Sequence, residues 1–171
     1  TAQQVYRNHE LLHANNLKES SPLDRLLLLG FALCCDATTN EHQRIGDPTE
    51  LALVDLLELY RMDELKTREK YPRIDENPFD SERKLMSTLH VIDGENRLLL
   101  KGACDEILKK ATYIQTEQGI RDITEDDRER ILKMNHTFAD NGLRVLGFAT
   151  RLVEKDHIEV EDENQLIFLG L

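Results

Sequence analysis

The stretch that decides the fold runs Lys84-Leu-Met-Ser-Thr-Leu-His-Val-Ile-Asp-Gly-Glu-Asn-Arg-Leu-Leu-Leu-Lys-Gly-Ala103. Residues 85–92 alternate in a way that predicts a strand buried mainly on one face, with His90 half-buried in the packing. Asp93-Gly-Glu-Asn96 is a turn signal, and three leucines then lead back to Lys101. The sequence therefore predicts a β-hairpin whose open end carries a long cation beside a glycine. Such an end suits an anionic ligand.

Helix signals lie on both sides of this hairpin. Ser21 and Asp47 each precede a proline, the order typical of an N-cap and a first helical position, and Thr124 is a third N-cap candidate. Glu50, three residues after Asp47, resembles the second half of a capping box, and capping alone would explain both residues. The expected helices cover about residues 22–33, 48–60, 63–71, 103–112 and 124–141, the last ending at Asn141-Gly142.

The remaining segments supply further strands and loops. A minor hairpin is expected at residues 113–114 and 119–120, followed by strands at 143–153 and 166–171, with Ile74 on an edge strand. Residues 36–43 are expected to form a polar loop, Asn77-Pro78 a turn, and 154–164 an acidic surface segment. Hairpins favour an antiparallel sheet with helices packed on it, so the predicted fold class is α+β (mixed α/β in some schemes), as one domain over residues 1–171.

Composition excludes several functions. The chain has 171 residues and a formal net charge of −11, which argues against non-specific binding to nucleic acid or to an anionic membrane. No apolar run approaches the roughly 18 residues that span a bilayer. The polar start predicts no signal peptide, and the missing initiator Met suggests a piece of a longer protein. The three cysteines are expected to be buried thiols in a reducing cytosol, and no cluster has zinc-ligand spacing.

Several side chains could hold a nucleotide by its base and sugar, although both Gly-rich phosphate loops are absent. Phe79 could stack on a base, and antiparallel pairing brings Lys84 and Lys101 to one end of the hairpin. Arg144 could supply a guanidinium fork for phosphate, and Glu50 could accept from a base amino group. Taken singly, each has a plainer interpretation: Phe79 as a core aromatic, the lysines as solvated strand ends, and Arg144 as a surface ion-pair member.

Four motifs occur together in a familiar order. These are Gly46-Asp-Pro-Thr-Glu-Leu-Ala-Leu53, Phe79-Asp-Ser-Glu-Arg-Lys-Leu-Met-Ser87, Leu100-Lys-Gly-Ala103 and Gly142-Leu-Arg-Val-Leu146. In order and spacing they resemble the nucleotide-binding (N) domain of P-type cation-transporting ATPases, most closely the calcium-pump-like branch. The resemblance covers essentially the whole chain, and four ordered motifs make it more specific than any one alone.

The resemblance implies an ATP site on an antiparallel sheet flanked by helices. The residues that it assigns to nucleotide binding are Glu50, Phe79, Lys84, Met86, Lys101, Gly102, Ala103, Arg144 and Leu146, with Thr49 a weaker candidate. It further implies a cytoplasmic domain of an integral membrane pump, using Mg-ATP in the parent protein and working with its phosphorylation and actuator domains. The domain itself is expected to be a monomer that contacts neither nucleic acid nor membrane.

Two residues depart from the family pattern. Ser81 stands where many calcium pumps carry an Arg, so a phosphate contact is either lost or supplied by Arg83, and Cys104 stands where Pro is usual. The phosphorylation motif Asp-Lys-Thr-Gly-Thr is absent, so no catalytic residue is assigned to this chain. Two alternatives stay open: an acidic, non-enzymatic protein-interaction domain, and a free-standing phosphatase or kinase.

Overall fold

The computed structural model describes residues 1–39 and 43–171, so part of the predicted 36–43 loop lies outside the described residues. Its helices are η1 (Ala14–Asn16), α1 (Pro22–Leu33), α2 (Pro48–Glu58), α3 (Glu64–Lys70), α4 (Cys104–Lys110), α5 (Glu125–Asp140) and η2 (Val160–Asp162). Its strands are β1 (Gln4–Arg7), β2 (Glu10–His13), β3 (Thr38–Thr39), β4 (Arg44–Ile45), β5 (Asp75–Asp80), β6 (Leu85–Ile92), β7 (Glu95–Gly102), β8 (Ala111–Thr116), β9 (Gly119–Asp122), β10 (Gly147–Leu152) and β11 (Leu166–Gly170).

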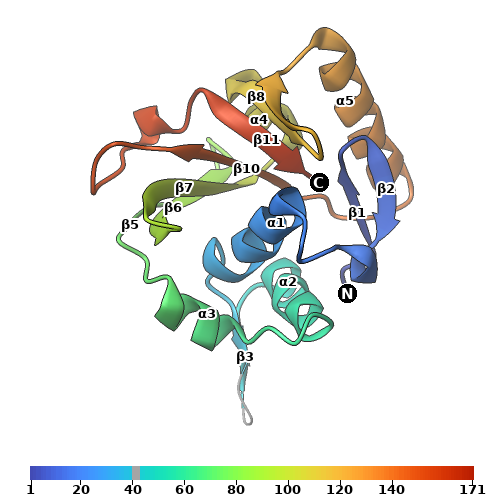
Figure 1. The fold of residues 1–171 in the computed structure, drawn as a ribbon. Helices are drawn as coiled ribbons and strands as arrows, with labels where there is room; N and C mark the ends of the chain where they lie inside the picture. The colour runs from blue at the N-terminus through green and yellow to red at the C-terminus, as the bar shows by residue number, and fades with distance from the viewer. Residues whose placement is uncertain (40–42) are drawn as a thin grey trace.

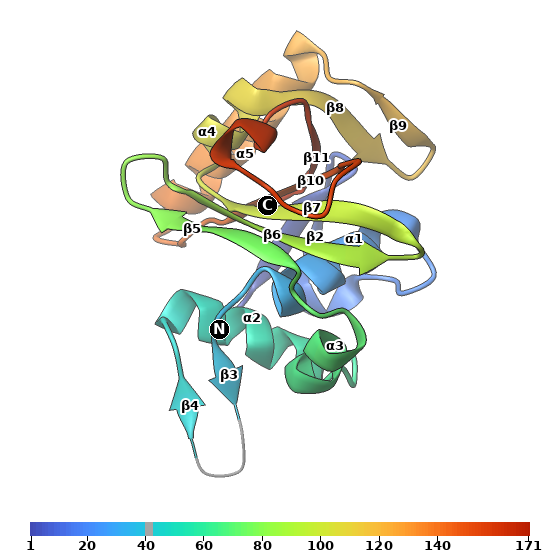
Figure 2. The same cartoon turned by 90° about the vertical axis from the view of Figure 1, so that its left-hand side faces the viewer.

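A seven-stranded sheet in the order β5-β6-β7-β10-β11-β8-β9 forms the centre of the molecule (Figures 1 and 2). Neighbouring strands are antiparallel except β8 and β11, which pair in parallel. The predicted α+β class is confirmed. The parallel pair was not predicted, because residues 111–116 and 166–170 lie far apart in the sequence and carry no local sign of their partner.

Helices cover both faces of this sheet. Met86 and Leu99 pack with α1 and α2 in one core cluster, whereas Leu85 and Leu100 pack with α4 and α5 in a second. Every residue of β6 except Val91 is therefore buried, including His90. The expectation of a strand buried mainly on one face, with a half-buried His90, is wrong, because alternate side chains meet a different helix layer rather than solvent.

The predicted caps position the helices. Ser21, Asp47 and Thr124 each accept a backbone hydrogen bond at the start of α1, α2 and α5, and Thr124 forms a full capping box with Asp127. Gly142, at φ +74°, follows the last turn of α5, as predicted. The minor hairpin appears as β8 and β9, and the last strand as β11.

Several segments differ from expectation. Asn77-Pro78 is not a turn but part of β5, because the Asn77 side chain is buried and bonds Ser87 at 3.0 Å while Pro78 is tolerated on an edge strand. The strand expected from residue 143 begins only at Gly147. Strand β3 lies within the loop predicted at residues 36–43, and it pairs with β4, which directly follows that loop. Figure 2 shows that β3 and β4 project away from the helices and the central sheet.

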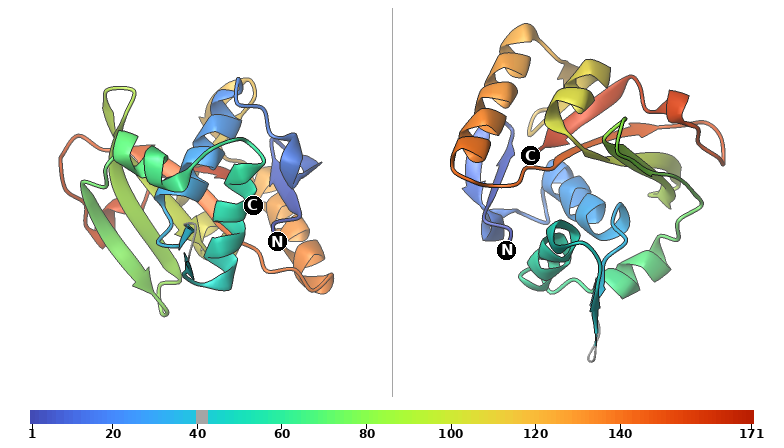
Figure 3. Two further views of the ribbon diagram at one scale, coloured as in Figure 1. Left: turned by 90° about the horizontal axis from the view of Figure 1, so that it is seen from below. Right: turned by 180° about the vertical axis from the view of Figure 1, so that it is seen from behind.

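The N-terminal hairpin β1–β2 was also not predicted. Asn8 and His9, both at positive φ, form its two-residue turn, and His9 Nε2 lies 2.7 Å from Asp127 at the start of α5. Tyr6 of β1 exchanges two backbone hydrogen bonds with Leu171, the residue that follows the end of β11. These bonds attach the N-terminal hairpin to the central sheet. Figure 3 shows this hairpin beside α5.

Candidate functional site

The ends of strands β6, β7 and β10 meet at the open end of the hairpin, where the sequence predicts an anionic ligand. Leu85 of β6 and Gly147 of β10 both lie opposite Gly102 of β7, and Met86 lies opposite Lys101. The Ala103 amide donates to the Lys84 carbonyl at 3.1 Å, which closes this end of the hairpin. The sheet thus brings together Lys84, Met86, Lys101, Gly102 and Ala103, as antiparallel pairing predicts. We call this region the site end of the hairpin.

Lys101 and Glu50 form an ion pair at the site end. The Lys101 ammonium donates to the Glu50 carboxylate, and their side chains are only 6% and 17% exposed. Glu50 also accepts from the Asp36 amide at 3.3 Å, and it does not complete a capping box at the start of α2. The capping interpretation holds for Asp47 but not for Glu50. Lys101 is likewise not a solvated strand end.

Phe79 projects from the end of β5 into solvent. Its residue is 61% exposed, so it is not the core aromatic that an isolated Phe usually is. Five residues later, the exposed Lys84 adopts φ +62°, and its amide donates to the Asp80 carbonyl at 2.6 Å. A tight turn therefore presents an aromatic ring and a cation on the same short segment, residues 79–84.

Gly102 is required by its surroundings. A Cβ atom at this position would lie 2.2 Å from the Lys84 carbonyl oxygen and 3.0 Å from the Leu85 Cα. Both atoms belong to the backbone, so the strands could not accept a side chain without moving apart.

The predicted roles of Met86 and Leu146 require contact with a ligand, whereas here Met86 is buried in the core and Leu146 packs partly against it.

Arg144 approaches the site from the segment before β10. Its Nη1 donates to the Thr49 hydroxyl at 3.3 Å, which links this segment to the first turn of α2. Arg144 is exposed, and among the described residues it has no ion pair with a carboxylate. A guanidinium has five N–H donors, and the contact with Thr49 uses one of them.

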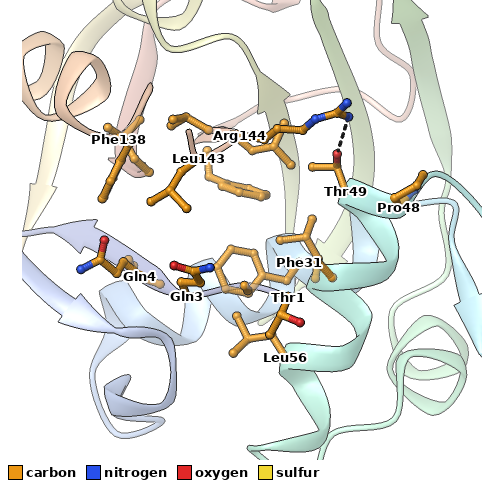
Figure 4. A pocket seen from close by; sticks show the side chains of 18 of the residues that line it. Thr1, Gln3, Gln4, Phe31, Pro48, Thr49, Leu56, Phe138, Leu143 and Arg144 are labelled. Atoms are coloured by element: carbon orange, nitrogen blue, oxygen red, sulfur yellow. Dashed lines mark hydrogen bonds between the residues drawn. The ribbon is translucent and has the colours of Figure 1, made fainter. Parts of the chain in front are cut away.

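A cavity of about 370 Å³ lies beside Arg144, between the N-terminal segment, α1, α2 and α5 (Figure 4). Phe31 and Phe148 meet edge to face in its wall with ring centroids 4.9 Å apart, and Gln3, Gln4 and Phe138 also line it. It shares Thr49, Arg144 and Leu146 with the predicted nucleotide residues, but neither Phe79 nor Lys101 lines it. The cavity and the site end are therefore neighbouring features. No local sequence signal predicts the cavity, because its walls come from distant segments.

Ser81 and Cys104 are the two departures from the family pattern, and the structure shows the contacts of Arg83 near Ser81 and the helix that begins at Cys104. Arg83, the possible substitute for an arginine at Ser81, directs its guanidinium to Glu163 at 2.6 Å rather than to the site end. Cys104 begins α4 behind Ala103, which provides no side-chain cap, yet the helix forms. All three cysteines are buried and free, and burial raises the pKa of the Cys34 thiol to about 11 and that of Cys104 to about 12.

Residues 1–39 and 43–171 hold neither a metal-ligand cluster nor a membrane-spanning helix. That part of the chain contains no group of three His, Cys, Asp or Glu side chains arranged to hold a metal ion. It also contains no helix with the length and apolar composition needed to cross a membrane.

Comparison with known proteins identifies the family. The family model described as "P-type ATPase, cytoplasmic domain N" matches residues 24–171. The chain belongs to this family. Among its relatives, a calcium-transporting ATPase of Bacillus cereus is 35% identical over 172 residues, covering 100% of this chain and 19% of the relative.

Two further relatives agree. Calcium-transporting ATPases of Lactococcus lactis and Listeria monocytogenes are 36% and 34% identical, each covering 86% of this chain and 17% of the relative. The resemblance inferred from the four motifs is confirmed, as is the cytoplasmic assignment through the family description. This N domain thus spans less than a fifth of the length of the curated relatives it matches.

Proposed function

We propose that this N domain binds ATP at the site end of the β6–β7 hairpin. The observation that carries the proposal is Phe79, an aromatic ring 61% exposed on the same segment as Lys84, which leads into the strand that pairs with the strand of Lys101. Leaving a large aromatic side chain in water is unfavourable, and stacking on a base offsets this by roughly 1–3 kcal/mol. The adenine ring stacks on Phe79 in this proposal.

The neighbouring residues receive complementary roles. Glu50 accepts from the adenine amino group, Lys101 lines the base pocket, and Gly102 and Ala103 let the base approach backbone. Met86 and Leu146 pack around the base in this proposal, and because Met86 is buried in the core, its side chain must move to make that contact. Lys84 and Arg144 contact the phosphates of ATP in this proposal. Mg²⁺ would reach the site already bound to those phosphates.

In the parent protein, the 1–171 domain would present the γ-phosphate of Mg-ATP to a phosphorylation domain. The relatives are calcium-transporting ATPases, which supports a calcium pump as the parent, with phosphorylation and actuator domains as partners. The contribution of the N domain would be positioning and closure rather than bond making. Changes here should therefore affect ATP affinity most.

The test is isothermal titration calorimetry with ATP on the wild-type domain and on Phe79→Ala. We expect Phe79→Ala to weaken binding by about 5- to 150-fold, the ratio that corresponds to roughly 1–3 kcal/mol of stacking. Ile120→Ala is the matched control, since Ile120 is 55% exposed on edge strand β9 at the far end of the sheet. Absence of wild-type binding at millimolar ATP would overturn the proposal and favour an acidic interaction domain.

A further inference from the structure

Glu163 is buried although it lies in the acidic segment expected on the surface. Its side chain is fully excluded from solvent, whereas its neighbour Glu161 is exposed. The carboxylate accepts two hydrogen bonds from Arg83, from Nε at 2.6 Å and from Nη2 at 3.2 Å, and one from the Ser87 hydroxyl at 2.7 Å. Burying a carboxylate so completely is costly unless it is paired and hydrogen-bonded in this way. The expectation of a solvated run is wrong at this residue.

Arg83 connects this carboxylate to both ends of the segment that carries Phe79. It directly precedes Lys84 in the sequence, and its Nη2 also donates at 3.1 Å to the carbonyl of Pro78, the residue directly before Phe79. Its side chain is only 14% exposed. One guanidinium therefore bridges the start and the end of residues 79–84, and Glu163 fixes the orientation of that guanidinium.

A second set of contacts fixes Asn77, which lies two residues before the segment 79–84. Asn77 Nδ2 donates to the Ser87 hydroxyl at 3.0 Å and to the Glu159 carbonyl at 3.0 Å. Strand β5, strand β6 and the segment after β10 thus converge on the Glu163 carboxylate. Without it, Arg83 would be a largely buried cation with no carboxylate, and the carbonyl of Pro78 would lose its fixed donor.

We propose that Glu163 is a positioning residue for nucleotide binding, acting through Arg83 to hold Phe79 and Lys84 in the orientation that receives the base and phosphates. The proposal rests on the proposed function, because it assigns a role toward the same site. Glu163 would not touch the nucleotide. Its effect would be pre-organisation, which strengthens binding by reducing the ordering that a ligand must impose.

The experiment compares ATP affinity, by calorimetry, of wild type, Glu163→Gln and Glu161→Gln. Glutamine keeps the shape but removes the charge that orders Arg83, so we expect Glu163→Gln to weaken ATP binding about tenfold, while Glu161→Gln binds as wild type. A double-mutant cycle separates positioning from general damage: in the Phe79→Ala background, Glu163→Gln should cost less than threefold, because the ring it orients is absent.

Each result decides the matter. If wild type binds ATP and Glu163→Gln binds equally well, the inference is overturned and the proposed function stands. If Glu163→Gln weakens binding tenfold in both backgrounds, its role is structural and the inference is also overturned. Should Glu163→Gln fail to fold, Arg83→Lys takes its place, since it keeps the charge but loses the fork that reaches Pro78; the same tenfold loss and the same cycle are expected.

Discussion

The two ends of the β6–β7 hairpin carry the same kinds of residue in opposite environments. At the site end, Lys101 and Glu50 pair with side chains 6% and 17% exposed, and Gly102 is surrounded by backbone. The opposite end, around the turn at Asp93 and Gly94, is the turn end. There Asp93 pairs with Arg25 of α1, with side chains 68% and 38% exposed, and a Cβ atom on Gly94 would have no atom within 4 Å. Burial, rather than residue type, is what fixes polar groups at the site end in directions that a ligand can use.

The largest contrast should come from breaking the two ion pairs. Lys101→Met leaves Glu50 largely buried without a cation, and we expect the free energy of unfolding to fall by about 3–5 kcal/mol. Arg25→Ala removes an exposed partner and should cost about 0–1 kcal/mol. Urea denaturation measures both. Equal losses would mean that the pair at the site end is no more desolvated than the one at the turn end.

The two glycines provide a second contrast. Gly102→Ala forces a methyl group against the Lys84 carbonyl, so about 3 kcal/mol of stability and most ATP affinity should be lost. Gly94→Ala meets no neighbouring atom and should cost about 1 kcal/mol, from its φ of +80°, without changing ATP binding. Thermal unfolding and ATP titration of both variants check this. Loss of ATP binding in Gly94→Ala would break the proposed division of the hairpin.

A smaller effect concerns pH and His90, which lies in β6 between the two ends. Burial lowers the pKa of His90 to about 4, and its neutral ring donates from Nδ1 to the Tyr71 carbonyl while Nε2 accepts from the Thr88 hydroxyl. The unfolded chain, with a histidine pKa of about 6.5, therefore takes up the proton first as the pH falls. Stability from this group is complete above about pH 6.5 and is lost as the pH falls toward about 4.

Between pH 7 and pH 5 this loss should amount to about 2 kcal/mol, at about 1.4 kcal/mol for each pH unit below 6.5. His90→Gln should remove that part of the pH dependence in urea titrations, whereas His136→Gln, at an exposed position on α5, should keep it. Identical pH profiles for wild type and His90→Gln would show that His90 is not held neutral by burial.

Much of the fold was predictable because its signals are local. N-caps at Ser21, Asp47 and Thr124 mark helix starts, and the alternation around Asp93-Gly94 marks the hairpin. The turn of β1–β2 also had a usable signal, since Asn8 tolerates the positive φ that a two-residue hairpin turn requires. Segments with such chemistry can be assigned without knowing what they contact.

The missed features depend on partners that are distant in the sequence. Glu50 reads as a capping residue until β7 brings Lys101, 51 residues later, beside it. In the sequence, Glu163 looks like one of several surface acids, because its partner Arg83 lies 80 residues earlier in the chain. A charge pattern gives the sign of a side chain but not its burial, so the contacts between the candidate site residues could not be predicted from the sequence.

The most direct test of the site-end assignment is an amide chemical-shift titration of the ¹⁵N-labelled wild-type domain with ATP. We expect the amides of Phe79, Lys101, Gly102 and Arg144 to shift in a saturable manner while those of Asp93 and Gly94 stay in place, and the Phe79→Ala variant to need a roughly 5- to 150-fold higher ATP concentration, the same loss as in calorimetry, for the same shifts. Shifts confined to the turn end, or no shifts at millimolar ATP, would contradict the account.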